Sequence, residues 1–428
     1  MRCLKVFLVF FAFTSTGLAA PKKVTFNKDV LPILQRNCQV CHRPGEIGPM
    51  SLLTYEAARP WAKSIKEAVL TRRMPPWFAD RGIGHFSNER SLTETEIKTL
   101  VEWVDGGAPE GNSAARPAPV KWVDGWNIKP NVIYGMPEPY TVPKEGILEY
   151  IYILLPAKFP TDTWVLNGEI HPSDRSVVHH ASVVVRPPGS KWMKSAKPGV
   201  PYEPTAQDRA ESTEPFYWLF GYAPGVSPEG HFSPQEDAGR FIPAGSDLFL
   251  EMHYTVNGKE SQDQTQLGLV LSNKRPARQL LNLIVTDNRF EIPPNAPNYG
   301  YSTSVLLDEP ITLLYLQPHL HLRGIDMKID VTYPDGRSET LLSVPRYNFM
   351  WQVIYMLAKP VKLPKGTRVL VSAHWDNSPN NKFNPDPSKT VRWGAQTGEE
   401  MLVALLGAVV EVNPDRYRKP GQMSSASR

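Results

Sequence analysis

The spacing of hydrophobic positions changes part way along the chain. Between residues 24 and 105, apolar residues recur every three or four positions, which is typical of amphipathic helices. This spacing predicts helices over 24–37 and 54–72, and a last helix that begins at 91–94 and ends before Gly106. The three helices together predict a small all-α domain over residues 21–110.

Individual residues indicate how these helices begin and pack. Asn27 is a candidate cap of the first helix, because its side chain can accept a hydrogen bond from an unpaired amide. Residues 91–94, Ser-Leu-Thr-Glu, resemble a capping box. The apolar stripe of the second helix is Trp61, Ile65 and Val69. The stripe of the last helix is Ile97, Leu100, Val101 and Val104.

After a linker rich in proline and alanine, residues 111–125, the pattern becomes that of short strands separated by turn residues. The first set of runs is 147–155, 163–166, 181–185, 247–256 and 266–271. The second set is 279–286, 301–307, 311–316, 325–333, 368–374 and 401–412. One sandwich needs only roughly 100 residues. We therefore predict two tandem antiparallel, jelly-roll-like β-sandwich domains, 126–275 and 276–412, and a polar tail, 413–428.

Charge and the N-terminus restrict location and partners. The formal net charge of +4 gives no reason to expect nucleic acid as a partner. Arg2 and Lys5 precede a short apolar run, and Gly17-Leu18-Ala19 follows it, which predicts a signal peptide over 1–20. The run is short for a membrane span, although an uncleaved anchor is the alternative. We expect a periplasmic or secreted protein that is not integral to the membrane after cleavage.

The two cysteines that remain after cleavage belong to one motif, Cys38-Gln39-Val40-Cys41-His42. In a C-x-x-C-H motif the thiols bond covalently to haem and the histidine binds the iron. A redox cysteine pair or half a zinc site is the alternative, but no second cysteine pair exists for zinc. The motif predicts one covalent haem c, and with the helices it predicts a class I-like cytochrome c domain.

The sixth iron ligand should be a methionine or a histidine. Met74 lies in the sequence Met74-Pro75-Pro76, where consecutive prolines end the second helix and stiffen the loop that follows. We therefore expect Met74 to be this ligand. Met50 and His85 are the alternatives.

Histidines in the β region form candidate copper ligands. His319 and His321 are two residues apart in a strand pattern, so their side chains should lie on the same face. Imidazoles combined with a thioether suit copper that cycles between two oxidation states. Met401, at the start of the last strand, is the best candidate thioether. A blue-copper site is excluded, because no cysteine is left to serve as its ligand.

Four short motifs occur in a fixed order: Val178-His179-His180-Ala181, Glu251-Met252-His253-Tyr254, His319-Leu320-His321 and Glu399-Glu400-Met401. In this order they resemble the copper type II, ascorbate-dependent monooxygenases, the family that contains the peptidylglycine α-hydroxylating and dopamine β-monooxygenases. The resemblance extends over roughly residues 130–412.

The resemblance implies two coppers that face each other across an open cleft. His179, His180 and His253 would hold the electron-transfer copper, and His319, His321 and Met401 would hold the copper at which O₂ reacts. Adjacent histidines on a regular strand point to opposite faces, so His179 and His180 can converge only if the backbone bulges or the strand ends there.

Two positions depart from the peptide-hydroxylating branch. Gln317 stands where that branch has a carboxylate-binding arginine, and Leu405 stands where it has a tyrosine. The disulfides of the family are also absent. A peptide with a C-terminal glycine is therefore not expected as substrate, and nothing supports a catecholamine.

The combined motifs imply hydroxylation of a C–H bond in an unidentified small organic substrate with O₂. An external redox partner would reduce the haem, and the haem would replace ascorbate as the immediate donor to copper. The alternatives are a haem and copper electron-transfer protein without catalysis, a metal-free β-sandwich binding module attached to a cytochrome, and a zinc hydrolase. Met401 and the lack of an H-E-x-x-H helix argue against the hydrolase.

Overall fold

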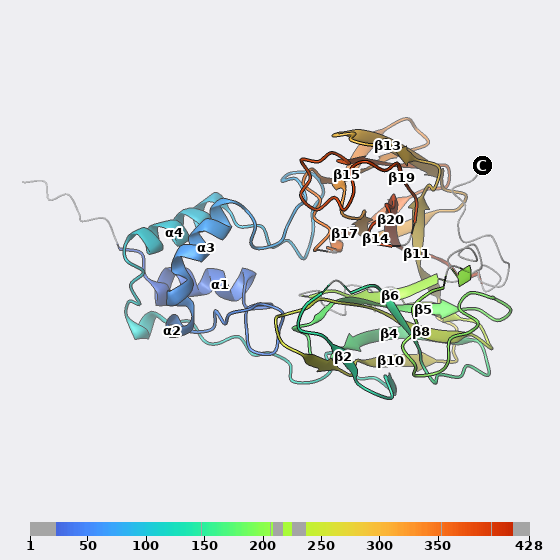
Figure 1. Ribbon diagram of the computed structural model, residues 1–428, viewed down its shortest axis with the longest axis horizontal. Coiled ribbons are helices and arrows are strands. Elements are labelled where there is room, and N and C mark those ends of the chain that lie inside the picture. Colours follow the sequence, from blue (N-terminus) through green and yellow to red (C-terminus); the bar gives the residue numbers. More distant parts are fainter. Residues whose placement is uncertain are drawn as a thin grey trace, which may run out of the picture.

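The computed structural model describes residues 23–146, 148–205, 207–208, 217–224, 237–351, 353–394 and 396–413. The predicted signal peptide, residues 1–20, lies outside these ranges, and so do residues 414–428 of the predicted tail. Within the described ranges, no helix has the length and apolar character needed to cross a membrane. The described chain is mostly β-sheet, with a short helical part at one end (Figure 1).

The helical part consists of short helices around a small core. They are η1 Phe26–Val30, α1 Leu31–Asn37, α2 Tyr55–Ala58, η2 Arg59–Trp61, α3 Ala62–Leu70 and α4 Glu94–Asp105, with a single 3₁₀ turn, η3 Ser113–Ala115, in the linker. Phe26, Leu34 and Trp103 are fully buried at the centre of this core. The helices therefore pack on one another through side chains of their own.

Three expectations about these helices are wrong. Asn27 is not a cap, because it lies inside the π-helical turn η1, whose N-cap is Thr25. The segment 54–72 is not one continuous helix: Pro60 has no amide hydrogen for an α-helical bond, and the chain passes there through the 3₁₀ turn η2. Trp61 is 42% exposed and does not join the apolar stripe.

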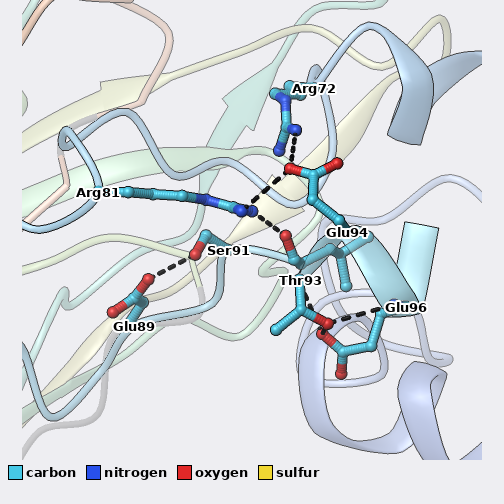
Figure 2. Close-up of polar contacts among 8 residues, drawn as sticks. Arg72, Arg81, Glu89, Ser91, Thr93, Glu94 and Glu96 are labelled. Carbon is cyan, nitrogen blue, oxygen red and sulfur yellow. Dashed lines mark hydrogen bonds and ion pairs between the residues drawn. The ribbon is translucent and has the colours of Figure 1, made fainter. Parts of the chain in front are cut away.

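The capping box of α4 lies two residues later than the sequence indicates (Figure 2). The Thr93 hydroxyl accepts a hydrogen bond from the Glu96 amide, and the Glu96 carboxylate accepts one from the Thr93 amide. Glu94 instead forms ion pairs with Arg72 and Arg81. Both arginines come from the chain between α3 and α4, so Glu94 joins this connection to the start of α4.

Each strand predicted from the sequence is present, and shorter strands occur between them. The first half contains β1 Val132–Gly135, β2 Tyr140–Val142, β3 Ile151–Leu154, β4 Thr163–His171, β5 Val178–Arg186, β6 Tyr217–Tyr222, β7 Ala238–Ile242, β8 Asp247–Tyr254, β9 Ser261–Asp263 and β10 Gln266–Ser272. The second half contains β11 Arg278–Thr286, β12 Glu291–Ile292, β13 Tyr299–Leu306, β14 Ile311–His319, β15 Gly324–Thr332, β16 Ser338–Val344, β17 Tyr355–Leu363, β18 Arg368–Trp375, β19 Val391–Arg392 and β20 Val403–Glu411. Most strands that the sequence did not indicate are short or lie at sheet edges, where hydrophobic alternation is weak.

One eight-stranded sheet, in the order β1-β10-β4-β7-β11-β20-β14-β17, runs through both halves. Its two parts join where β7 pairs in parallel with β11 over only two residue pairs, Ala238 with Arg278 and Gly239 with Gln279. A four-stranded sheet covers each part, β3-β8-β5-β6 in the first half and β13-β18-β15-β16 in the second. Each half therefore has the two layers of a β-sandwich, and the junction lies close to residue 276.

Buried contacts cross this junction. Tyr315 of β14 packs into the core of the first half. Arg240 of β7 is 2% exposed and donates a hydrogen bond of 2.9 Å to the Tyr315 hydroxyl. Gly407 of β20 leaves room for the ring, because a Cβ there would lie 2.0 Å from it. These contacts set the direction of β14, which carries His319 at its end.

Residues 77–88, here named the docking segment, leave the helical part and pack on the second β half. Trp77 and Phe86 belong to the core of that half. The Asp80 amide donates to the Ser343 carbonyl at 2.8 Å, and the His85 carbonyl accepts from the Ala358 amide at 2.8 Å. In Figure 1 this segment is the blue loop that reaches from the helices toward β15 and β17.

Candidate metal centres

His179, His180 and His253, here named the histidine cluster, converge because of a β-bulge. Strand β5 pairs with β8 so that Val178 faces Tyr254 and His180 faces His253, and the register shifts between these two pairs. His179 is the extra residue of the bulge. A bulge turns one side chain toward a face that it would otherwise avoid. Of the two conditions under which the adjacent histidines could converge, a bulge or the end of the strand, the structure shows the bulge.

The ring nitrogens of the cluster lie within ligand distance of a shared ion. Nδ1 of His179 lies 3.2 Å from Nδ1 of His253 and 3.0 Å from Nδ1 of His180. The candidate ligand atoms all lie within 4.8 Å of one another. The three side chains are nearly shielded from solvent, with 6%, 8% and 9% exposure. Each of these ring nitrogens can present a lone pair, and lone pairs this close repel one another unless a proton or a cation lies between them. The three nitrogens therefore form a donor set that fits a metal ion.

Backbone carbonyls select which nitrogen of a ring is left for a metal. The Met350 carbonyl accepts a hydrogen bond of 2.7 Å from Nε2 of His179, so Nε2 carries the proton and Nδ1 offers the lone pair. The ring of His253 is also hydrogen-bonded to a carbonyl, that of Leu148. Tyr150 stacks on His253, with ring centroids 4.5 Å apart, and holds that ring in place.

Burial keeps the cluster neutral. Burial lowers the pKa of His253 to about 4, with a further contribution from His179. The pKa of His180 lies well below its usual value, first through burial and then through the neighbouring imidazoles. A neutral imidazole is the form that binds a metal, so the cluster can remain competent below the pH at which an exposed histidine becomes protonated.

These pKa shifts predict the pH dependence of the metal-free protein. A histidine whose pKa is lowered by folding contributes stability above pH 6.5, and this stability is lost as the pH falls toward the folded-state value. We expect the free energy of unfolding in urea to decrease between pH 6.5 and about 4, by up to roughly 3 kcal/mol from His253 alone. His253→Phe should weaken this slope, because it removes the buried imidazole. Equal slopes in the wild type and His253→Phe would contradict the prediction.

His319 and His321, here named the histidine pair, also come together. His319 is the last residue of β14 and His321 lies just beyond it, with ring centroids 5.2 Å apart and planes 87° apart. The Glu399 carbonyl lies 3.1 Å from Nδ1 of His321, which leaves Nε2 as the lone-pair nitrogen. Burial lowers the pKa of His321 to about 3, and His319 adds to this.

Met401 lies two residues before β20, the strand that pairs with the end of β14. The β14–β20 ladder ends where His319 faces Val403, and Met401 and His321 both lie just beyond that pair. Met401 is half-buried, and its neighbour Glu400 accepts a hydrogen bond from the His321 amide at 2.9 Å. This arrangement keeps Met401 as the candidate thioether ligand.

Glu400 is a supporting residue whose role the sequence did not indicate. Its buried carboxylate accepts hydrogen bonds from the amides of His321 and Arg323 and from Nε1 of Trp375, at 2.9, 2.7 and 3.0 Å. Burial raises its pKa to about 7, although these donors lower it. The carboxylate thereby fixes the turn after β14 that presents His321. Its only sequence signal is its position beside Met401.

Phe349 lies against both groups of histidines. Its ring centroid is 5.9 Å from that of His321 and 6.4 Å from those of His179 and His253. It is 7% exposed. The resemblance implied an open cleft between the two groups, but here an aromatic side chain occupies this position. Sequence reasoning missed Phe349, because nothing in the pattern around residue 349 distinguishes it from a core residue.

The Cys38, Cys41 and His42 side chains lie at the edge of the helical core. Nδ1 of His42 lies 3.2 Å from the Met50 carbonyl, so Nε2 remains as the nitrogen for iron. Burial raises the pKa of Cys38 to about 12 and also raises that of Cys41, so both are thiols at neutral pH. Gly48 is required beside them, because a Cβ there would lie 2.6 Å from the Cys41 carbonyl oxygen. Two thiols and an imidazole nitrogen are the groups that covalent haem attachment needs, and the haem stays a prediction.

The candidate sixth ligands differ in position. The Met50 carbonyl contacts His42, which places that residue on the side of the first iron ligand. His85 lies in the docking segment and bonds to Ala358 of β17. Met74 follows α3, and its amide bonds to the Ala68 carbonyl at 3.2 Å. None of these contacts joins Met74 to His42, so Met74 as the sixth ligand stays a prediction.

Comparisons with known proteins do not show a family. No family model and no curated protein matches the chain. An Aeromonas sobria serine protease–chaperone complex shares 14% identity, with 33% of this chain and 28% of that chain covered and a TM-score of 0.16. A structure of infectious bursal disease virus Gx strain shares 8% identity, with 72% and 77% covered and a TM-score of 0.19. Likenesses this weak carry no argument about fold or function.

Proposed function

We propose that this chain is an exported copper- and haem-c-containing oxidoreductase, similar to the type II copper monooxygenases, that hydroxylates a C–H bond of a small organic substrate with O₂. The observation that carries the proposal is the convergence of three Nδ1 atoms at the bulge of β5. It occurs at the two motifs that the resemblance assigns to one copper. A second group of imidazoles lies nearby, on the other half of the β region.

The chain's own residues have separate roles in this proposal. His179, His180 and His253 would hold one copper, and His319, His321 and Met401 would hold the other. Copper in these sites would supply O₂ activation and one-electron redox chemistry. The carbonyls of Met350, Leu148 and Glu399 orient the imidazole rings. Phe349 and the burial of the rings exclude water from the space between the two groups.

The helical part would hold the haem as a cytochrome c-like domain. Cys38 and Cys41 would form the thioether bonds, and His42 and Met74 would bind the iron. A haem with histidine and methionine ligands supplies electrons at a raised potential. The Met50 carbonyl fixes the His42 ring with Nε2 directed away from this hydrogen bond.

A haem and copper electron-transfer protein without oxygenase activity is the second candidate. The position of Phe349 against both groups of histidines favours it, because a ring there restricts the access of substrate. Phe349→Ala distinguishes the two functions. In a monooxygenase this change should alter the rate of O₂ consumption by the reduced protein, whereas an electron-transfer protein should show slow O₂ consumption with either residue.

The cofactor inventory tests both candidates without a known substrate. Purified protein should contain one haem that resists extraction by acidified organic solvent and two coppers per chain. Anaerobic reduction followed by exposure to O₂ should then reoxidise both metals. Protein that is fully folded, exposed to copper during purification and still free of it would overturn the proposal and favour a metal-free binding module.

Substitutions of Met401 test the second copper site. Met401→Ile should weaken Cu(I) retention at the histidine pair roughly 10- to 100-fold, measured by competition with a Cu(I) chelator, because a soft thioether is lost. Met401→His should retain copper but abolish O₂ chemistry, because a third imidazole makes the site harder and disfavours the reduction of Cu(II) to Cu(I). Met356→Ile, a change in β17, serves as the control. Wild-type Cu(I) affinity in Met401→Ile would exclude Met401 as a ligand.

A further inference from the structure

The segment that follows the C-x-x-C-H motif contacts the first β half through an ion pair. The Glu46 carboxylate accepts hydrogen bonds from Arg43 at 2.6 Å and from Arg175 at 2.9 Å. The side chains of Glu46 and Arg175 are only 8% and 22% exposed. Removing one partner of a shielded pair costs more than removing one partner of a solvent-exposed pair, because the remaining charge is left poorly solvated and unpaired.

Arg175 lies directly before the strand that carries the histidine cluster. It belongs to the turn between β4 and β5, four residues before His179. Glu46 follows the C-x-x-C-H motif by four residues, so its 2.9 Å ion pair with Arg175 places the segment after the motif beside the turn that leads into β5.

The linker, residues 111–125, contacts the helical part at several places. The Arg43 guanidinium lies 4.0 Å from the centroid of the Trp122 ring. Arg116 donates to the Asn27 side chain at 3.1 Å, and Gln35 donates to the Ala118 carbonyl at 2.9 Å. The linker is therefore bound along much of its length instead of acting as a free tether.

The docking segment provides a second attachment, to the other β half. Its Asp80 and Asn88 side chains bond to Ser343 and to the Ile354 carbonyl at 2.6 and 2.7 Å. Arg81, in the same docking segment, forms an ion pair with Glu94 at the start of α4 and so connects the segment back to the helical part (Figure 2). The helical part is thus attached to both β halves at separate places.

We propose that the helical part is permanently docked, with the segment after its C-x-x-C-H motif against the turn before β5, and that the Glu46–Arg175 pair sets this position. Docking there would direct electrons from the haem to the electron-transfer copper that the resemblance assigns to the histidine cluster. The inference rests on the proposed function and specifies its electron route. The haem would be held by Cys38, Cys41 and His42, and the copper by the histidine cluster. An external one-electron donor would reduce the haem, and one electron would then pass from ferrous haem to Cu(II), giving ferric haem and Cu(I) with no bond broken.

The first test identifies the acceptor. Full-length protein with oxidised copper is mixed anaerobically with a reduced cytochrome, and the haem and copper spectra are followed after mixing. Met401→Ile, which affects only the histidine pair, should keep the fast phase of haem reoxidation. His253→Ala should lose it. A fast phase that persists in His253→Ala, or that is lost in Met401→Ile, would overturn the proposal.

The second test examines the position of the haem. Arg175→Glu should slow the fast phase by roughly tenfold or more, because it introduces repulsion in a shielded contact. Arg175→Lys should largely restore the rate, and Arg392→Gln, which removes an exposed ion pair, should not change it. The haem content, the copper content and the redox potentials of haem and copper should be the same in these variants as in the wild type. If Arg175→Glu does not fold, Glu46→Gln tests the same contact from the other side.

Linker length separates docking from simple tethering. Four residues, Gly-Ser-Gly-Ser, inserted after Asp124 should leave the rate unchanged if the helical part is docked. A tether without docking would show a slower rate, because the effective concentration falls as the linker lengthens. A slower rate with the insertion, together with a wild-type rate in Arg175→Glu, would refute docking. None of these tests needs a substrate. The electron route can therefore be confirmed even if the protein hydroxylates nothing. A protein that binds no copper would instead contradict the proposed function itself.

Hydrogen exchange gives a readout that does not depend on electron transfer. In haem-loaded, copper-free protein, residues 172–177 should exchange more slowly than in Arg175→Glu, because docking shields this turn. Equal exchange in the two proteins would show that the contact is not maintained in solution.

Discussion

Replacing His253 with alanine is expected to leave one copper per chain in place of two. The cluster has three imidazoles, and the neighbouring Nδ1 atoms of His179 and His253 are 3.2 Å apart, so the loss of one removes a third of the donor set. The two imidazoles that remain should bind copper with an affinity lower by at least about 100-fold. This loss is larger than the one caused by removing a residue that only supports a ligand. The ring that stacks on Tyr150 is also lost, which frees the neighbouring strand.

Copper is counted by mass spectrometry after dialysis against a weak chelator. His374→Ala is the matched control, because His374 is a partly exposed histidine that pairs with Asp326 outside the cluster. The control should retain two coppers. If His253→Ala also retained two, the histidine cluster would be an ordinary buried contact, and the first copper would have to be sought elsewhere.

Replacing both Cys38 and Cys41 with alanine is expected to remove the haem completely while copper remains bound. The motif has no other thiols, since the only other cysteine in the sequence is Cys3 in the predicted signal peptide. The helical part should also lose stability, because Cys38 packs against its core and the haem would complete that core. The β region, whose two cores contain no residue of this motif, should unfold as in the wild type.

Haem is measured by its absorption and by retention on the denatured chain, and Val40→Ala, inside the same loop, is the control. In the variant without haem, a reduced cytochrome should no longer reduce copper at the wild-type rate. Wild-type copper reduction by the same donor would show that electrons bypass the helical part. Haem that extracts freely from the unaltered protein would contradict covalent attachment.

The position of Phe349 has a consequence for substrate access. In the proposed function, a substrate that approaches the histidine pair from the side of the histidine cluster would meet this ring, because the ring lies against His321 and against two members of the cluster. The adjacent Met350 carbonyl is bonded to His179. Any movement of this segment would therefore affect the orientation of a ring in the first site and access to the second.

Much of this arrangement follows from local patterns. Strand positions were predictable because apolar residues recur over short distances, and the runs at 279–286 and 311–316 lie within β11 and β14. The closeness of His319 and His321 follows from their spacing of two residues. The candidate haem residues could be found because covalent attachment needs thiols and a histidine in one short motif. Each of these features depends on residues that lie close together in the sequence.

Other features depend on contacts between distant segments, and no local pattern contains them. The capping box at Thr93 was misplaced and the break at Pro60 was missed, because several local arrangements were compatible with the same residues. The bulge that turns His179 toward His253 requires the pairing of β5 with β8. Glu400 acquires its role only where β20 meets the turn after β14. Glu46 and Arg175 are separated by well over 100 residues, and only the packing of the helical part on the β region brings their charges together.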